Sequence, residues 1–458
     1  MEGPRLRSVD PTTEELFATY PETAAEEVVS HIETAHQLHT EWMKTPLNER
    51  KGYMFRLASV LEGRREELAV LMAREMGKPV TQGRAEVGKC AWVCRYYAEE
   101  TETILQDHQV DADRNKSYMT YRPLGVVLAV MPWNFPLWQV MRFAAPALMA
   151  GNAGILKHAS NVTGCAIAID EMVVEAGFPD GLFRTVVVPS SRVAEMIENP
   201  RIVAVTLTGS GAAGRSVASK AGQELKKTVL ELGGADPYLI LEDADLDLAV
   251  RACAFGRLLN GGQSCIAAKR FIVHRSVADA FTVKLTEAMG AYTIGNPLDD
   301  DTELGPMARV DLRDELHDQV LTSIGVGARL VTGGVVPDGP GAFYPPTILT
   351  DVTAGMPVYH EETFGPVASI IAFDEEEEAI RIANDSIFGL GGAVFTRDLE
   401  RGERIARDRI EAGSCFVNTF VASDPRLPFG GIKASGYGRE LSHVGMREFL
   451  NVKTVVVD

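Results

Sequence analysis

Cys265 has the neighbours that a reactive thiol needs. Gly261 and Gly262 precede it and allow an irregular backbone and the close approach of another group. Gln263 and Ser264 place polar atoms beside the sulfur. Because the thiolate is the attacking species, such a polar and partly accessible setting favours covalent catalysis. The alternative is a cysteine packed in the interior, and this segment alone leaves it open.

A second motif, residues 209–214 (GSGAAG), follows a predicted strand and opens a predicted helix. This G-x-G-x-x-G pattern can place a pyrophosphate on the helix N-terminus. Glu231 lies near the distance at which an acidic residue binds an adenosine ribose. It also ends an apolar strand before two glycines, where a partly desolvated carboxylate would suit a general base. The pattern leaves both roles open, as well as a glycine turn without a ligand.

Composition narrows the function classes. The net charge of −18 over 458 residues argues against binding to nucleic acid or to an anionic membrane, since both reward basic patches. Six cysteines in so long a chain form no disulfide framework and suggest a reducing compartment. Cys90 and Cys94 have no second pair at zinc spacing, so we expect no metal. With no secretory signal and no membrane-length apolar run, we expect a cytoplasmic protein.

The elements that must position these residues fall into three stretches. Residues 24–104 carry helix formers at helical spacing, and residues 105–122 turn polar and then alternate like an exposed strand. From residue 123, apolar strands alternate with helices, which predicts a parallel sheet covered on both faces. The tail, 448–457, ends in an alternating edge strand able to pair with another chain. Predicted helices span 24–43, 48–74, 81–103, 138–150, 166–176, 213–226, 243–258 and 277–289, and predicted strands span 125–131, 152–156, 185–188, 203–208, 229–232 and 270–274.

Further motifs follow in a recognisable order. They are residues 132–136 (PWNFP), Lys157, 209–210 (GS), 231–234 (ELGG), 262–265 (GQSC), 362–366 (ETFGP) and 428–433 (PFGGIK). In this order they resemble the aldehyde dehydrogenase superfamily over nearly the whole chain. Residues 134–142, 156–161, 263–271 and 304–309 are most similar to the short-form succinate-semialdehyde dehydrogenases.

The resemblance implies an α/β fold in three parts. A Rossmann-type cofactor-binding domain would comprise residues 1–104 and 123–232, and an α/β catalytic domain residues 233–435. Residues 105–122 and 436–458 would form a small β oligomerisation flap, which agrees with the predicted edge strand. We therefore expect a homodimer or a homotetramer.

The resemblance also implies roles for the catalytic residues. Cys265 would attack the aldehyde carbonyl, and Asn134 with the Cys265 backbone N–H would hold the oxyanion. Hydride would pass to the nicotinamide and leave a thioester, and Glu231 would activate the water that hydrolyses it. This role replaces the ribose interpretation of Glu231.

For the cofactor, the resemblance implies binding by Trp133, Lys157, Ser160, Gly209, Ser210, Glu362 and Phe364. Many NAD-preferring relatives carry Glu at the position of Ser160, where it repels a 2′-phosphate. A hydroxyl beside Lys157 removes that repulsion and can donate to the phosphate. We expect NADP⁺ to be preferred, with NAD⁺ as a weaker cofactor.

For the substrate, Arg142 matches a carboxylate-binding arginine and Ser423 a hydroxyl donor, and Phe429 is expected beside them. Arg426 is a candidate for a second charge unless Asp424 neutralises it. The alternative for Arg142 is an ordinary ion-paired helix residue. We expect oxidation of succinate semialdehyde to succinate, the alternative being another aliphatic or aromatic aldehyde.

Three other function classes fit less well. Transfer of the acyl group to coenzyme A is disfavoured by Glu231, which points to water as the acceptor. A binding protein on the same fold would not need Cys265, Asn134, Glu231 and Glu362 together. A cysteine hydrolase lacks a histidine in a recognisable dyad context near Cys265.

Overall fold

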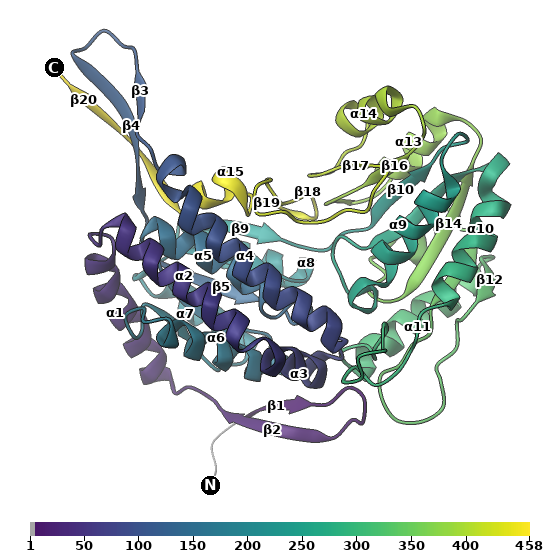
Figure 1. The fold of residues 1–458 in the computed structure, drawn as a ribbon, viewed down its shortest axis with the longest axis horizontal. Coiled ribbons are helices and arrows are strands. Elements are labelled where there is room, and N and C mark those ends of the chain that lie inside the picture. Colours follow the sequence, from purple (N-terminus) through teal and green to yellow (C-terminus); the bar gives the residue numbers. More distant parts are fainter. Residues whose placement is uncertain (1–4) are drawn as a thin grey trace.

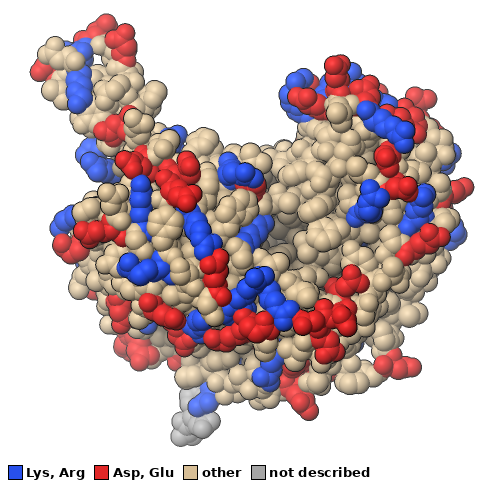
Figure 2. All heavy atoms as spheres, in the orientation of Figure 1, with Lys and Arg blue, Asp and Glu red and all other residues tan. Residues whose placement is uncertain are grey.

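The computed structural model describes residues 5–458 as two lobes and a projecting arm (Figure 1). Each lobe is built on its own sheet, and a cleft separates the lobes. Figure 2 shows this face hollowed between the lobes, with charged side chains of both signs around a mostly uncharged hollow. Within residues 5–458, no helix is long and apolar enough to cross a bilayer.

The first lobe contains a six-stranded sheet in the order β19-β9-β8-β5-β6-β7. All neighbours are parallel except β19 and β9. From β5 the chain adds β6 and β7 on one side of the sheet and then β8 and β9 on the other side. The boundary between β5 and β8 is therefore the topological switch point. In such sheets ligands bind beyond the carboxyl ends of the strands at this switch point. The strands are β5 (Val126–Met131), β6 (Ala153–His158), β7 (Phe183–Thr185), β8 (Ile202–Thr208), β9 (Lys227–Glu231) and β19 (Gly436–Tyr437).

Helices cover this sheet because its strands are apolar on both faces; β6, for example, is buried throughout. The helices are α1 (Ala25–Trp42), α2 (Leu47–Gly63), α3 (Arg65–Met76), α4 (Val80–Ile104), α5 (Trp138–Ala150), α6 (Thr163–Glu175), α7 (Val193–Glu198), α8 (Gly211–Gln223) and α15 (Ser442–Arg447), with short 3₁₀ turns η1 (Ser160–Val162) and η2 (Ser190–Arg192). An N-terminal hairpin, β1 (Arg5–Val9) and β2 (Leu16–Pro21), completes the lobe.

The second lobe contains a seven-stranded sheet in the order β12-β13-β14-β11-β10-β16-β17, parallel except for β12. Its strands are β10 (Asp236–Ile240), β11 (Ala268–His274), β12 (Arg329–Thr332), β13 (Thr347–Thr350), β14 (Val367–Phe373), β16 (Ala393–Phe395) and β17 (Phe416–Val417). Its helices are α9 (Leu246–Leu258), η3 (Leu259–Gly262), α10 (Arg275–Gly290), α11 (Val310–Gly325), α12 (Pro357–His360), α13 (Glu376–Asn384) and α14 (Leu399–Asp408). A separate two-stranded pair joins β15 (Phe388–Gly389) to β18 (Ile432–Lys433).

The arm is a three-stranded antiparallel sheet that projects away from both lobes (Figure 1). Its strands are β3 (His108–Val110), β4 (Lys116–Pro123) and β20 (Leu450–Val457). All of β20 pairs with β4, which confirms the predicted C-terminal edge strand. The predicted flap range 436–458 also contains β19 and α15, and β19 pairs with β9 of the first lobe.

Two predicted elements are wrong in detail. The helix expected over 48–74 is two helices, because the backbone leaves helical geometry at Arg64 (φ −96°, ψ 13°) directly after Gly63. The strand expected over 185–188 lies instead at Phe183–Thr185. Val186 and Val188 are buried without forming a strand, so their apolar character reflects packing. The pattern of helices and strands around residues 123–232 otherwise agrees with the predicted parallel sheet.

Candidate active site

Cys265 lies in the loop that joins η3 of the second lobe to β11. Left-handed backbone precedes it, with φ of 65° at Gly261 and 71° at Gly262. A Cβ at Gly262 would come within 2.4 Å of the Gly365 carbonyl oxygen, so only glycine fits this turn. The buried Arg257 guanidinium donates a 2.6 Å hydrogen bond to the Gly262 carbonyl oxygen and holds the turn in place. The glycines therefore shape the loop that carries the thiol, as predicted.

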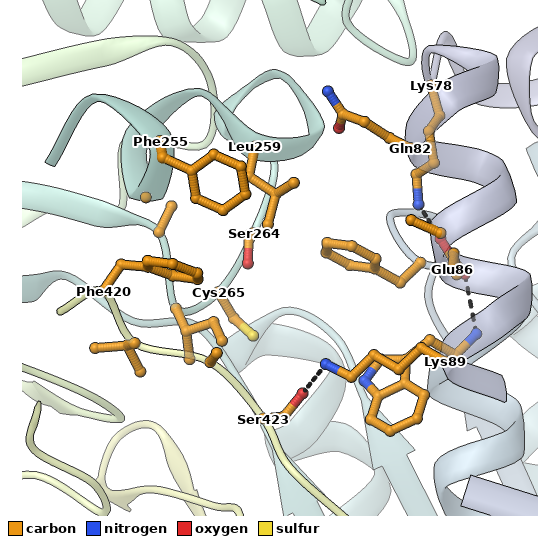
Figure 3. Close-up of a pocket in the computed structure, with 18 of the residues that line it drawn as sticks. Lys78, Gln82, Glu86, Lys89, Phe255, Leu259, Ser264, Cys265, Phe420 and Ser423 are labelled. Carbon is orange, nitrogen blue, oxygen red and sulfur yellow. Dashed lines mark hydrogen bonds and ion pairs between the residues drawn. The ribbon is translucent and has the colours of Figure 1, made fainter. Parts of the chain in front are cut away.

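Two cavities meet at Cys265. The α4 cavity, of about 380 Å³, lies between helix α4 and loops of the second lobe (Figure 3). The switch-point cavity, of about 410 Å³, lies beyond the carboxyl ends of β5 and β8. Cys265 and Gln139 line both cavities. A nucleophile at this junction can contact one ligand in each cavity.

The thiol of Cys265 is protonated at neutral pH in this structure. Burial raises its pKa to about 12, an effect that Arg142 and Lys269 oppose and Glu362 and Glu231 reinforce. A partly buried thiol with so high a pKa is a weak nucleophile until a base takes its proton. The site therefore needs a base within reach of Cys265.

Glu231, at the end of β9, is the candidate base. Both of its carboxyl oxygens are buried and have no hydrogen-bond partner among the described residues. Burial raises the pKa of Glu231 well above its usual value; Glu440 raises it further, and Arg142 and Arg439 lower it. A carboxylate with a raised pKa is a stronger base once ionised. Glu231 lines neither cavity, so the base role requires its side chain to turn toward Cys265.

Asn134 follows β5 and reaches the nucleophile loop from the first lobe. Its Nδ2 donates a 3.0 Å hydrogen bond to the backbone carbonyl oxygen of Gln263. The backbone carbonyl oxygen of Asn134 accepts a 2.7 Å bond from Asn260 Nδ2. A side-chain amide carries two N–H groups, and Gln263 takes only one of them. Asn134 lines the switch-point cavity together with Cys265, so the second N–H is positioned to serve an oxyanion formed on the substrate.

The switch-point cavity has the features of a dinucleotide site. Gly209 and Ser210 connect β8 to α8, and the Ser210 hydroxyl caps that helix by accepting from Ala213 N at 3.3 Å. The remaining donors near the helix N-terminus suit a pyrophosphate. A Cβ at Gly233 would lie 2.4 Å from Glu362 Oε2, so glycine lets the Glu362 carboxylate approach the backbone here. These residues fit the cofactor that the sequence predicts.

At the other end of this cavity, Trp133 and Phe364 pack edge to face with ring centroids 5.7 Å apart. Glu362 Oε1 accepts from Gly234 N at 3.0 Å and from Lys269 Nζ at 2.8 Å. This leaves Glu362 Oε2 for a ligand hydroxyl. A carboxylate and an aromatic face side by side suit a ribose and a planar ring.

Lys157 and Ser160 line neither cavity. Lys157 ends β6, the neighbour of β5, and so lies at the same sheet edge as the switch-point cavity. It is buried without a carboxylate partner among the described residues, and burial lowers its pKa. Ser160 begins η1, two residues beyond β6. Both positions suit the more distant end of an elongated ligand.

The predicted substrate residues separate into two groups. Arg142, Ser423 and Phe429 line the α4 cavity, whereas Arg426 does not. Arg426 is exposed and forms a bidentate pair with Asp424, at 2.9 and 2.6 Å. This pairing matches the neutralisation that the sequence left open.

Arg142 is already engaged inside the protein. Its side chain is 2% exposed and forms an ion pair with Glu440. It also donates to Thr208 Oγ1 at 3.3 Å and lies over the Phe429 ring, 4.6 Å from the centroid. The charge on this arginine is therefore balanced within the structure.

Sequence reasoning missed two residues of the site. Lys89, on α4, lines the α4 cavity and donates to Ser423 Oγ at 2.8 Å. Glu440 lies beside both Arg142 and Glu231. Lys89 belongs to no motif and sits in a helix with many charged residues, so no pattern distinguishes it. Glu440 also lies outside the motifs, and its pairing with Arg142 depends on the tertiary fold.

Comparison with known proteins places this site in a family. The aldehyde dehydrogenase family matches residues 1–455. A probable NADP⁺ succinate-semialdehyde dehydrogenase of Synechocystis sp. is 49% identical over 98% of this chain and 99% of its own length. The NADP⁺ succinate-semialdehyde dehydrogenase 1 of Mycobacterium tuberculosis is 48% identical over 98% of this chain and 99% of its own.

Solved structures agree with these matches. A succinic semialdehyde dehydrogenase from Streptococcus pyogenes, solved with NADP⁺, superposes with a TM-score of 0.97 at 40% identity, covering 99% of both chains. A lactaldehyde dehydrogenase structure gives a TM-score of 0.96 at 32% identity, covering 99% of this chain and 96% of the other. The loop that carries Cys265, the donor Asn134 and the two cavities are thus parts of a known architecture, and the chain belongs to the aldehyde dehydrogenase family.

Proposed function

We propose that this protein oxidises succinate semialdehyde to succinate with NADP⁺ as the preferred electron acceptor. The observation that carries the proposal is the position of Cys265, at the junction of a dinucleotide-like cavity and a second cavity that three cations, Lys78, Lys89 and Arg142, line. Cations in an otherwise apolar cavity suit an aldehyde that ends in a carboxylate. The names of the Synechocystis and Mycobacterium tuberculosis relatives support the same substrate and cofactor.

The first chemical step follows from the protonation state of the thiol. Because the pKa of Cys265 is about 12, Glu231 takes the thiol proton as sulfur attacks the aldehyde carbon. The new S–C bond moves the carbonyl π electrons onto oxygen. Asn134 Nδ2 and the Cys265 backbone N–H then stabilise that oxyanion by hydrogen bonds.

When bound, NADP⁺ would supply a hydride acceptor for the former aldehyde carbon. Trp133, Phe364 and Glu362 would hold its nicotinamide ribose end, and Gly209 and Ser210 its pyrophosphate. Hydrolysis of the acyl group from Cys265 needs a water that loses a proton as it attacks. Glu231 suits that task because burial raises its pKa. Glu440 and Arg142 lie beside it and set the local charge balance.

NADP⁺ preference rests on Lys157 and Ser160. Neither repels a 2′-phosphate, and Lys157 has no carboxylate partner among the described residues to compete with one. The Streptococcus pyogenes relative was solved with NADP⁺, which supports the same choice. Ser160→Glu should shift the preference toward NAD⁺, because a carboxylate there repels the phosphate and bonds the ribose hydroxyls.

The decisive experiment is a matrix of steady-state rates. Succinate semialdehyde, glutarate semialdehyde, butanal and benzaldehyde are each assayed with NADP⁺ and with NAD⁺. The proposal expects the highest kcat/KM for succinate semialdehyde with NADP⁺. Equal kcat/KM for butanal leaves a general aldehyde dehydrogenase, the second candidate, which the similarity to a lactaldehyde dehydrogenase favours. A higher kcat/KM with NAD⁺ overturns the cofactor preference alone.

We propose further that the protein acts in the cytoplasm as a homodimer or homotetramer, and the arm supports the assembly. On β20, Val452 and Val456 are 54% and 55% exposed on a strand with one free edge. Exposed apolar edge strands pair readily with another chain. Light scattering should give the mass of two or four chains, and a stable monomer would contradict the assembly.

A further inference from the structure

Lys89 is a cation without an anion. From α4 it extends across the α4 cavity, where Nζ donates to Ser423 Oγ at 2.8 Å (Figure 3). Its Nζ also lies 4.4 Å from the centroid of the Trp138 ring. Among the described residues, no carboxylate forms an ion pair with it. A hydroxyl and an aromatic face leave most of the ammonium charge uncompensated.

The two carboxylates near Lys89, those of Glu86 and Asp424, already bind other groups. Glu86, one helical turn earlier, pairs with Lys78 and accepts the backbone N–H groups of Leu137 and Trp138 at 3.0 and 2.9 Å. Asp424 gives both carboxylate oxygens to Arg426. The remaining positive charge in the cavity therefore belongs to Lys89.

Arg142 and Lys78, the other cations that line the cavity, are both ion-paired, Arg142 with Glu440 and Lys78 with Glu86. Thr208 and the Phe429 ring also hold the Arg142 guanidinium in place. A substrate carboxylate that bound Arg142 would have to compete with Glu440. At Lys89 there is no such competitor, and the neighbouring Ser423 hydroxyl can turn its proton toward a second carboxylate oxygen.

We propose that Lys89, together with Ser423, binds the carboxylate of the semialdehyde and so determines the preference for ω-carboxy aldehydes. This inference rests on the proposed function and names the contact that selects the substrate. Burial, and after it the charge on Arg142, lowers the pKa of Lys89 to about 8, in agreement with an ammonium group that lacks an anion. A bound carboxylate would stabilise the charged form.

The test compares Lys89→Met, Lys89→Arg and wild type on succinate semialdehyde and on butanal. Methionine keeps an unbranched stem against Trp138 but removes the charge. Loss of a charge-assisted contact should lower kcat/KM for the semialdehyde roughly 10- to 150-fold, mainly through KM. Butanal oxidation should change by less than about threefold and also shows that the variant is folded. Lys89→Arg should recover much of the semialdehyde activity.

A matched control and a pH series complete the design. Lys51→Met removes a lysine that pairs with Glu102 on the outer helices, and it should alter neither substrate. In wild type, KM for the semialdehyde should rise as the pH passes about 8, because Lys89 loses its charge, while KM for butanal stays level. Lys89→Arg should not show this rise, since arginine stays charged.

The outcomes separate this inference from the proposed function. A wild type that uses butanal as well as the semialdehyde refutes both. A wild-type preference that survives in Lys89→Met refutes the role of Lys89 alone. Equal losses on both substrates also refute it, because they indicate a structural role on α4.

Discussion

Replacing Gly262 by alanine should disable the enzyme by distorting the turn that precedes Cys265, without removing any side chain of the site. At this position φ is 71°, and left-handed geometry costs an alanine about 1–2 kcal/mol. The new Cβ would also lie 2.4 Å from the Gly365 carbonyl oxygen and 2.8 Å from Arg257 Nη2. Moving away would break the bond from Arg257 to the Gly262 carbonyl oxygen, worth about 1.5–3 kcal/mol for a charged donor. The total is about 2.5–5 kcal/mol of stability.

Three residues later in the chain, Cys265 would shift with the loop. A displacement of about 1 Å at a reacting atom can cost about 100-fold in rate. Thermal unfolding and the burst of reduced cofactor on adding aldehyde measure the two effects. Gly222→Ala, in α8 with no atom within 4 Å of the added Cβ, is the control and should unfold at the wild-type temperature or above. If Gly262→Ala keeps the wild-type unfolding temperature and burst, the argument from the turn is refuted.

Three further predictions concern the catalytic groups. Glu231→Gln should lower steady-state turnover about 10²–10⁴-fold, measured as the rate of cofactor reduction, and turnover within tenfold of wild type would assign the base to another residue. Asn134→Ala should lower kcat about 10²–10³-fold, and a change confined to KM would contradict an oxyanion role. Alkylation of Cys265 by iodoacetamide in ligand-free protein, corrected with Cys265→Ala, should quicken about tenfold per pH unit up to pH 10 because the pKa of the thiol is about 12. A plateau near pH 7 would show that the thiolate already forms there.

Much of the positioning scaffold could be predicted because it is periodic. The apolar run of β5 and the helical spacing of α5 predict the strand and helix that flank Asn134. The break at Arg64 was invisible because buried Leu61 and Leu68 keep a helical spacing across it. Val186 and Val188 are buried by packing in a loop, and in the sequence these apolar residues look the same as those of a strand. Local patterns thus identify which residues are buried more reliably than whether those residues form a helix, a strand or a loop.

The chemistry of the site was predictable to a different extent. Cys265, Asn134 and Glu231 lie in distinctive short motifs, so their identity needs no tertiary information. The ion pair that occupies Arg142 comes from Glu440, almost three hundred residues away in the chain. The importance of Lys89 depends on what its neighbours already bind. Charge balance in a buried cavity is a property of the fold, and a sequence motif does not contain it.

The proposed catalytic groups are divided between the lobes, and buried hydrogen bonds hold the two halves together. Cys265 belongs to the second lobe and Asn134 to the first, and Asn134 Nδ2 bonds the Gln263 carbonyl oxygen at 3.0 Å. Asn260 Nδ2 of the second lobe donates to the backbone carbonyl oxygen of Asn134 at 2.7 Å. Leaving such groups unpaired in the interior costs about 1–3 kcal/mol each, so separating the lobes here is unfavourable. Two separate cavities meet at Cys265, so the proposed substrate and cofactor sites do not need the lobes to part. The distance between nucleophile and oxyanion donor is therefore set by the folded protein before either ligand binds.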